Sequence, residues 1–213
     1  MDTPNSGTAR LDYAEYEDEE LVEIVRQAGP GDTRAFEALL ERHQSRVLTN
    51  CRYMTRSSAN AEDLAQEVFV RAYFGLAKFR GDAAFGTWVR RIKVNHCLNF
   101  IRKQERRSGE ISLETPGVEA HEAVREEPGA AETLESLDER GRIDGVLDEM
   151  VDTLRIPLLM RDLDEMSYRE IADALGIGLS AAKMRVKRGR AEFREKYESR
   201  FGGLGGEDGG TET

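Results

Sequence analysis

The stretch from Phe85 to Arg107 combines basic and aromatic side chains in a pattern that suits contact with nucleic acid. It reads FGTWVRRIKVNHCLNFIRKQERR and holds seven bases against one acid, Glu105. Arginine and lysine neutralise phosphates, while aromatic rings stack on unpaired bases for about 1–3 kcal/mol each. We interpret the stretch as a surface for single-stranded nucleic acid, although packing of its lone Trp88 in a core is an equally good explanation of that residue.

A second basic stretch, from Lys183 to Lys196, holds seven bases and two acids and has a different character. It follows a Ser-x-x-Glu capping box at Ser167 and a helix-ending glycine at Gly176. Helix, short glycine-containing turn and helix in this order predict a helix-turn-helix. Because the bases fall on one side of the last helix, we expect that side to enter the groove of duplex DNA; a solvated charged face is the alternative.

The sequence offers little support for an enzyme active site or a metal site. The three histidines lie in separate segments, and neither cysteine belongs to a Cys-x-x-Cys pair. Asp162, Asp164 and Glu165 lack the spacing of a calcium loop, and no glycine-rich phosphate loop is present. We therefore expect no enzyme activity, no metal and no cofactor.

The bulk properties describe a strongly polar chain whose charge is segregated. The 213 residues carry 41 acids and 31 bases, a formal charge of −10, and the acids concentrate in residues 1–20 and 108–139. No apolar run reaches the roughly 18 residues of a membrane helix, and the acidic N-terminus does not resemble a secretory signal. We expect no membrane insertion, a cytoplasmic location and reduced thiols at Cys51 and Cys97.

Hydrophobic periodicity predicts an all-α fold made of two small helical domains joined by a flexible acidic linker. In the first domain, residues 18–107, four helices are expected, with Asp18, Asp32 and Asn60 at or near the first three helix starts. In the second domain, residues 137–201, the helix-turn-helix is expected to have Ser180 as the cap of its last helix.

Composition predicts that the remaining segments do not pack. These are an acidic N-terminus (1–17), the linker (108–136), which is rich in Glu, Pro and small residues, and a Gly-rich tail (202–213). Such segments cannot bury enough apolar surface to offset their ordering entropy, so we expect them to be disordered.

Two runs in the sequence resemble a known family. DLAQEVFVRAYFGLAKFRGDAAFGTWVRRIKVNHCLNFIRKQERR, from Asp63 to Arg107, resembles region 2 of the bacterial sigma factors, in the extracytoplasmic-function (ECF) group of the sigma-70 family. MSYREIADALGIGLSAAKMRVKRGRAEFREKY, from Met166 to Tyr197, resembles region 4 of the same family. The two domains that contain these runs, residues 18–107 and 137–201, together cover about 150 residues in the family's order, with a linker where the family has one.

The resemblance implies a factor that binds core RNA polymerase, recognises the −35 and −10 promoter elements, melts the −10 element and directs transcription initiation. The polymerase-binding positions it implies are Asp63, Gln66, Glu67, Phe69, Val70, Arg71 and Leu76. The positions implied for binding and melting the −10 element are Arg80, Asp82, Phe85, Thr87, Trp88, Arg91, Lys93, Asn95, Asn99, Arg102 and Arg106. Those implied for the −35 duplex are Ser180, Lys183, Arg185, Lys187 and Arg188.

A stand-alone helix-turn-helix regulator that never binds polymerase remains the alternative. The two hypotheses separate at Asp63, Gln66 and Glu67, because such a regulator has no use for that helix surface. We expect a monomer, and the sequence leaves open whether the chain has an anti-sigma factor, the inhibitory partner that the family often has. The promoter sequence is also open, since Asn99 stands where many relatives carry Asp.

Overall fold

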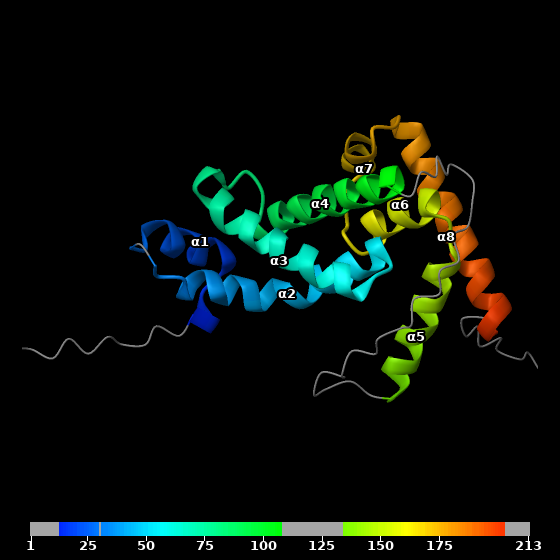
Figure 1. Cartoon of the computed structure of the whole chain (residues 1–213), viewed down its shortest axis with the longest axis horizontal. Coiled ribbons are helices and arrows are strands. Elements are labelled where there is room, and N and C mark those ends of the chain that lie inside the picture. Colours follow the sequence, from blue (N-terminus) through cyan, green and yellow to red (C-terminus); the bar gives the residue numbers. More distant parts are fainter. Residues whose placement is uncertain (1–12, 30, 108–133, 203–213) are drawn as a thin grey trace, which may run out of the picture.

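The computed structural model describes residues 13–29, 31–107 and 134–202, and every regular element in these ranges is helical (Figure 1). This agrees with the predicted all-α class. The first half contains two 3₁₀ turns and four α-helices, which are η1 (Tyr13–Glu15), α1 (Asp18–Gln27), α2 (Arg34–Thr55), α3 (Ser58–Gly75), η2 (Leu76–Lys78) and α4 (Phe85–Arg107).

The first three α-helices begin close to the predicted positions but not at them. Glu17 precedes α1, and its N–H donates to the Glu20 carboxylate at 2.8 Å. Thr33, not Asp32, precedes α2. Ser57, not Asn60, caps α3, since its hydroxyl accepts the N–H of Asn60. A serine is a good helix cap because it satisfies an N–H that has no partner inside the helix.

The core of the first half lies between α2, α3 and α4, which run side by side along the molecule (Figure 1). Their apolar faces interdigitate, and α1 closes one end through two fully buried residues, Leu21 and Val22. Hydrophobic burial of this kind contributes about 25 cal/mol per Å² and supplies most of the stability of a small helical unit. The central buried side chains are Leu39, Cys51, Met54, Leu64, Val68, Phe85, Val89 and Cys97.

The acidic N-terminus is partly ordered, which corrects the expectation that residues 1–17 do not pack. Tyr13–Glu15 form η1, and the guanidinium of Arg42 donates to the carbonyl oxygens of Tyr13 and Ala14 at 2.9 and 3.0 Å. The same guanidinium contacts Asp18 at 3.0 Å. One arginine on α2 therefore holds this segment in place, and the prediction for residues 1–12 lies outside the described residues.

The second half contains four more helices, which are α5 (Leu134–Glu149), α6 (Asp152–Asp162), α7 (Tyr168–Leu175) and α8 (Leu179–Phe201). The start of α5 falls inside the segment predicted to be linker, so helix begins earlier than expected. The rest of that linker, residues 108–133, and the tail from residue 203 lie outside the described residues. Pro157 lies within α6, whose residues 155–160 are all buried.

The helix-turn-helix forms as predicted at α7 and differs at the start of α8. The Ser167 hydroxyl accepts the N–H of Glu170, whose carboxylate accepts the N–H of Ser167, completing the capping box. Gly176 ends α7 with φ of 68°, a left-handed conformation that glycine adopts without strain. Gly178, not Ser180, precedes α8, so Ser180 lies in its first turn.

Helices α6 and α8 cross at close range, and a glycine makes that approach possible. A Cβ atom built on Gly189 would lie 2.8 Å from the Leu154 carbonyl oxygen on α6 and 3.3 Å from the Leu158 side chain. Real Cβ atoms essentially never approach an atom so closely. The crossing therefore requires glycine at position 189, between the buried residues Ala182, Val186 and Tyr197 of the same helix.

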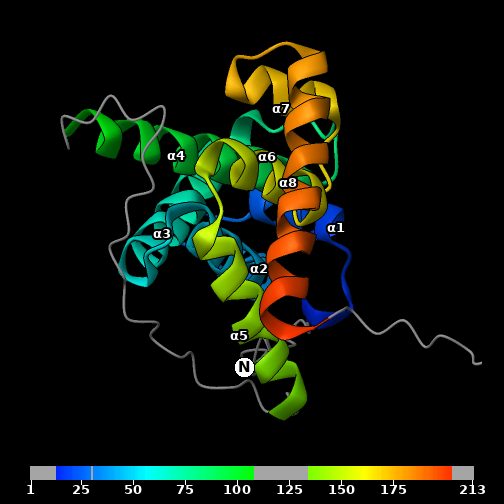
Figure 2. The same ribbon diagram turned by 90° about the vertical axis from the view of Figure 1, so that its right-hand side faces the viewer.

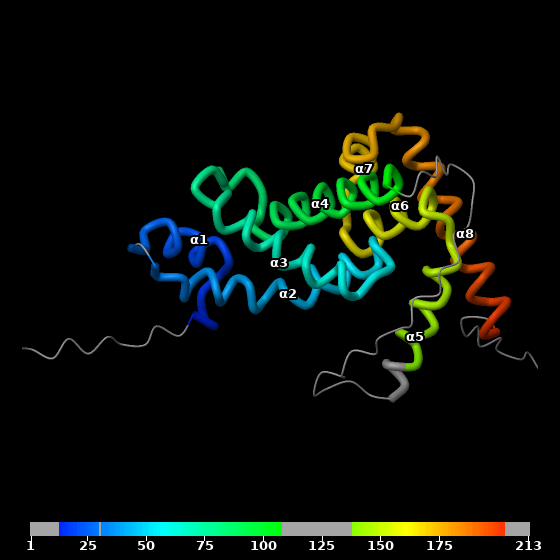
Figure 3. Tube along the Cα trace, in the orientation of Figure 1, coloured from blue at the N-terminus to red at the C-terminus, as the bar shows by residue number. Residues whose placement is uncertain are grey.

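The two halves pack against each other. Helix α6 lies against α2, and α7 lies beside α4 (Figures 1 and 2). Helices α5 and α8 run side by side away from this contact (Figure 3). None of the described helices is long and apolar enough to span a membrane.

Candidate nucleic-acid and protein interfaces

One face of α3 exposes acidic, amide and apolar side chains in adjacent rows. Five of the seven predicted polymerase-binding residues lie there with their side chains in solvent, namely Asp63, Gln66, Glu67, Val70 and Arg71. Glu67 and Arg71, one turn apart, approach to 3.7 Å. Both side chains are more than half exposed, so this ion pair contributes little to stability and stays available to a partner.

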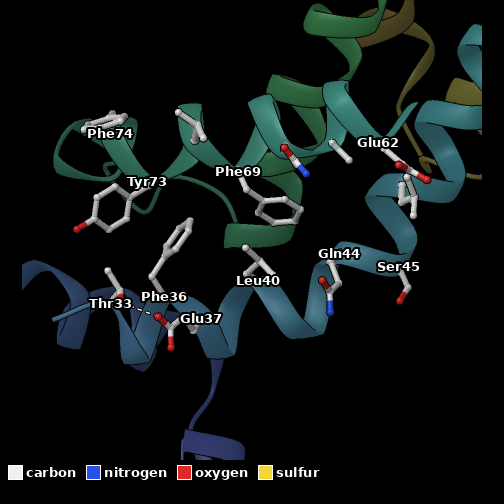
Figure 4. A pocket seen from close by; sticks show the side chains of 14 residues that line it. Thr33, Phe36, Glu37, Leu40, Gln44, Ser45, Glu62, Phe69, Tyr73 and Phe74 are labelled. Atoms are coloured by element: carbon white, nitrogen blue, oxygen red, sulfur yellow. Dashed lines mark hydrogen bonds between the residues drawn. The ribbon is translucent and has the colours of Figure 1, made fainter. Parts of the chain in front are cut away.

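Beside this face, α2 and α3 enclose a groove of about 750 Å³ (Figure 4). From α2 its wall is formed by Phe36, Leu40 and Leu48, and from α3 by Phe69 and Tyr73. Polar groups from both helices, including Gln44 and Glu62, rim the apolar floor. An apolar groove with a polar rim between two helices is suited to a helical partner.

The structure places two predicted polymerase contacts differently. Leu76 lies in η2 and is 3% exposed, so it packs in the core and cannot meet a partner directly. Phe69 is 5% exposed and lines the groove, so little of its side chain is open to a partner. The sequence interpretation missed Phe74, which is 76% exposed at the end of the groove. The spacing of Gln66, Val70 and Phe74, four residues apart on one helix face, was the signal that could have found it.

Helix α4 carries a row of exposed polar and basic side chains along one side. These are five of the predicted −10 contacts, at intervals of three and four residues: Arg91, Asn95, Asn99, Arg102 and Arg106. Positions spaced in this way share a helix face, so the row is continuous over much of the helix. Cationic and amide groups in one line can follow a phosphate backbone and hydrogen-bond to exposed bases.

An aromatic cluster precedes this row, at the N-terminal end of α4. Trp88 is half-buried, its ring centroid 4.9 Å from that of Phe79 and 5.9 Å from that of Phe85. A Cβ on Gly75 would lie 3.1 Å from the indole ring, so the backbone of α3 also touches it. Phe85 is fully buried, and its ring packs against the indole in a tilted arrangement. The indole ring is therefore packed on one side and keeps solvent contact on the other, and its role in strand binding stays a prediction.

The loop before α4 brings further predicted residues to the same end. Arg80 and Asp82 are exposed, and Thr87 is half-buried on the first turn of α4. Gly81, between the first two, has φ of 76°, which turns the chain sharply. The backbone carbonyl of Phe79 accepts a hydrogen bond from Arg26 of α1, which fixes the loop to the domain.

Lys93, predicted to hold promoter DNA, lies on the opposite side of α4 and is buried at 1% exposure. Its ammonium group forms an ion pair with Asp164, from the turn after α6, which is 2% exposed. In this arrangement Lys93 cannot reach nucleic acid. Lys93 was predicted to bind DNA because it stands in a basic run. The signal that it faces inward was the helix phase, since Val89, Val94 and Cys97 around it are buried.

Helix α7 lies against the exposed row of α4. Glu170 accepts from Arg91 at 2.8 Å, and the Ala174 carbonyl accepts from Arg102 at 3.3 Å. The Arg91 guanidinium, together with hydrogen bonds from Ser167, lowers the pKa of Glu170 from 4.5 to about 2. Two of the predicted −10 contacts are thus occupied by the second half of the chain.

Helix α8 presents its predicted duplex-binding residues to solvent. Ser180, Lys183, Lys187 and Arg188 are exposed, and Arg185 is half-buried. On the other side of the helix Ala182, Val186 and Gly189 pack inward, as the periodicity predicted. Arg190 has a different role, since its guanidinium pairs with Asp162 at the end of α6.

Among the described residues, no group of three or more His, Cys, Asp or Glu side chains could hold a metal ion. The thiols of Cys51 and Cys97 lie 3.6 Å apart between α2 and α4 and are both fully buried. The hydrogen bond with Cys51 and burial together raise the pKa of Cys97 well above its usual range. The same hydrogen bond lowers the pKa of Cys51, and it is the full burial of both thiols that keeps them from reagents in solvent.

Family models and relatives agree on where this chain belongs. Residues 39–107 match sigma-70 region 2 and residues 140–193 match sigma-70 region 4. The ECF RNA polymerase sigma-E factor of Escherichia coli K12 is 32% identical over 185 residues, covering 85% of this chain and 94% of the relative. The RNA polymerase sigma-H factor of Pseudomonas aeruginosa PAO1 is 29% identical over 179 residues, covering 82% of this chain and 90% of the relative.

Solved structures share the fold. The sigma factor RpoE of Bartonella quintana, crystallised with the anti-sigma factor NepR, superposes with a TM-score of 0.57 at 19% identity, covering 78% of this chain and 98% of that one. CnrH, in complex with the cytosolic domain of CnrY, gives 0.55 at 22% identity, covering 86% and 98%. Two helical units carrying regions 2 and 4 in this order define a sigma-70-type initiation factor. This chain belongs to the extracytoplasmic-function sigma factors.

Proposed function

We propose that this chain binds core RNA polymerase through the exposed face of α3 and the adjoining groove, and then uses two separate surfaces to engage a promoter. The row on α4, with the aromatic cluster at its N-terminal end, takes the −10 element as an opened strand. The basic side of α8 takes the −35 element as duplex. The chain acts in the cytoplasm and performs no catalysis itself, since the polymerase supplies the chemistry.

The chemistry of each surface supports this division. The α4 surface joins bases and amides to a half-exposed indole, and stacking on such a ring favours unpaired bases. The α8 surface offers charge and short polar groups without aromatic rings, which suits a major groove. Since both surfaces belong to one chain, binding at the first raises the effective concentration of the second, so each contact can be weak alone.

The observation that carries the polymerase assignment is the exposed combination of Gln66, Glu67, Val70 and Phe74 beside the α2–α3 groove. An isolated DNA-binding regulator gains nothing from leaving Phe74 in solvent, where it costs solubility. An exposed large aromatic side chain beside an apolar groove is typical of a protein-binding surface.

Replacing these side chains tests the assignment. We expect Gln66→Ala/Phe74→Ala to weaken binding to core RNA polymerase by about 2 kcal/mol or more, roughly 30-fold, because hot-spot truncations cost this much. The measurement is a fluorescence-anisotropy titration of labelled chain with core enzyme, accompanied by run-off transcription on a genomic library. Glu41→Ala, an exposed position on α2 that does not line the groove, is the matched control.

An unchanged affinity in the double variant would refute the use of this surface. A wild-type chain that binds duplex DNA but not core polymerase would instead favour the stand-alone regulator. Because both groups are exposed, their replacement leaves the helical fold intact, which circular dichroism checks.

A further inference from the structure

The contact between the two halves centres on a buried cluster of three polar side chains that we call the latch: Asn50 of α2, Lys93 of α4 and Asp164 of the α6–α7 turn. The Asp164 carboxylate accepts from the Asn50 amide at 2.7 Å and from the Lys93 ammonium group. All three residues are at most 6% exposed. The first two belong to the region 2 half and the third to region 4, so the latch joins the halves directly.

Buried charges of this kind favour either a fully closed contact or fully separated halves, and they disfavour partly opened arrangements. Inside the contact each charge needs its partner, because an unpaired buried charge is strongly destabilising. When the halves separate, water solvates both groups, which offsets most of the lost attraction. The latch therefore specifies one closed geometry and adds little to the net stability of the closed state. A contact with this property can open again.

A second group of contacts, one turn further along, is polar as well. The buried guanidinium of Arg155 on α6 donates to the carbonyl oxygens of Tyr53 and Met54, in the last turn of α2. These oxygens have no partner within their own helix. Arg56, just after α2, donates to the Met150 carbonyl and approaches Asp152 at 3.1 Å. These polar groups lie beside an apolar core that is continuous through both halves, so they fix the geometry of the contact while the apolar residues supply much of its stability.

Closure has opposite effects on the two DNA-binding surfaces. It places α7 on the α4 row, where Glu170 and the Ala174 carbonyl engage Arg91 and Arg102. It leaves Lys183, Lys187 and Arg188 on α8 in solvent. The closed chain can thus present its duplex-reading side while the strand-binding row is obstructed.

We propose that the latch of Asn50, Lys93 and Asp164 holds the free chain closed, and that it must open before the α4 row binds an opened strand, whereas α8 binds duplex DNA in either state. This inference rests on the proposed function for the identity of the two surfaces. It assigns to Lys93 a role in holding the domains together in place of the DNA contact expected from sequence.

Replacing latch residues should change the shape of the full-length chain in solution. Lys93→Met leaves Asp164 buried without its cation, and Asp164→Asn leaves Lys93 without its anion. We expect each to raise the radius of gyration measured by small-angle X-ray scattering. The double variant Lys93→Met/Asp164→Asn buries no charge and keeps an acceptor for Asn50, so it should return to the wild-type value.

Two single variants that both keep the wild-type radius of gyration would overturn the latch. So would a double variant as expanded as the singles, because the effect would then not depend on charge pairing. Circular dichroism identifies any variant that loses helix, and the cross-linking experiment then decides the question without substituting latch residues.

Cross-linking tests the functional half of the proposal. Arg46 on α2 and Glu165 in the α6–α7 turn are exposed and approach to 3.4 Å across the contact. Arg46→Cys/Glu165→Cys, joined by a short bismaleimide, locks the chain closed without altering either DNA surface. The latch of the unlinked chain can still open when a strand binds, whereas the cross-linked chain cannot open, so locking should weaken binding of a mixed-sequence single strand of about 12 nucleotides by about tenfold or more.

Binding of a short mixed-sequence duplex should be unchanged by the same cross-link. Unlinked double variant and bismaleimide-treated wild type are the controls, the latter because the native thiols are buried. Equal single-strand affinity before and after linking would overturn the proposal, as would an equal loss for duplex. Neither readout uses polymerase, so the latch and the proposed polymerase surface fail or succeed independently.

Discussion

Neighbouring bases of α4 differ in what they can contact, and the helix phase sets the difference. Arg91 and Lys93 lie two residues apart, which on a helix places them on different sides. Arg91 is exposed and pairs with Glu170 at 2.8 Å, while Lys93 is buried with Asp164. These two cations of one basic run therefore differ in role. Arg91 forms an exposed ion pair across the α4–α7 contact, whereas Lys93 is enclosed in the core with its carboxylate partner.

Trp88 is the residue whose replacement bears most directly on strand capture. Its half-exposed ring can stack on an unpaired base, so Trp88→Ala should weaken single-strand binding by about 1–3 kcal/mol. Trp88→Phe, which keeps a ring, should lose less. As the only tryptophan of the chain, it should also be quenched when a strand binds. Unchanged affinity in Trp88→Ala would show that the ring serves the core alone.

Glu170 makes a pH-dependent contribution at the α4–α7 contact. Its pKa is lowered to about 2, so the ionised form is favoured by folding. This contribution is fully present above the ordinary value of 4.5 and is lost as the pH falls toward 2. NMR titration of the Glu170 carboxyl should give a midpoint near 2.

The variant Arg91→Ala removes the largest cause of that shift, and the midpoint should rise toward the ordinary value while the capping box with Ser167 remains. An unmoved midpoint would show that α7 does not rest on α4 in solution. The exposed Arg91–Glu170 pair contributes little stability by itself, so its titration reports the position of α7 and not the strength of the fold.

At the scale of elements, the crossing of α6 and α8 depends on one missing side chain. Gly189→Ala would press a methyl group against the Leu154 carbonyl, and we expect a loss of about 1–3 kcal/mol in the stability of this half. Thermal unfolding measures it. Gly178→Ala is the matched control, because a Cβ there meets nothing within 4 Å and φ is −69°.

An equal stability of the two alanine variants would mean that the helices separate enough to admit the methyl group. The measured loss also bears on duplex binding, because α8 takes its orientation from this crossing. A repacked crossing should weaken −35 binding without touching Lys183 or Lys187, which lie on the other side of the helix.

Local signals allowed the elements to be predicted well from the sequence. The Ser167 capping box and Gly176 are complete within a few residues, so the start and end of α7 followed from them. Helix starts that depended on choosing between adjacent polar residues were less certain, and Ser57 and Gly178 took the positions expected for Asn60 and Ser180. Which of several neighbouring polar residues caps a helix depends on the backbone conformation at the helix end, and residue type alone does not reveal that conformation.

Side-chain positions that depend on the second half of the chain could not be predicted. The burial of Lys93 needs Asp164, 71 positions away, and the burial of Arg155 needs carbonyl groups of α2. Neither partner is visible in a local pattern. Phe74 was overlooked for the opposite reason, since an apolar residue in a helix is normally assigned to the core and this one is exposed.

At the scale of the whole molecule, the polarity of the contact between the halves is its most consequential property. The buried apolar core is continuous through both halves, and the contact between them adds Lys93, Arg155 and Arg56 with their carboxylate and carbonyl partners. Separation therefore exposes apolar surface as well as these polar groups, and only the polar groups recover favourable contacts from water.

The exposed basic side of α8 has a consequence for how a target site is located. Cationic side chains hold any duplex weakly and let a protein travel along it before specific contacts form. While the α4 row is obstructed by α7, the chain would move along duplex DNA in this way without binding transiently unpaired segments that it meets. The search for a site would then depend on α8, and stable binding of the opened strand would depend on α4.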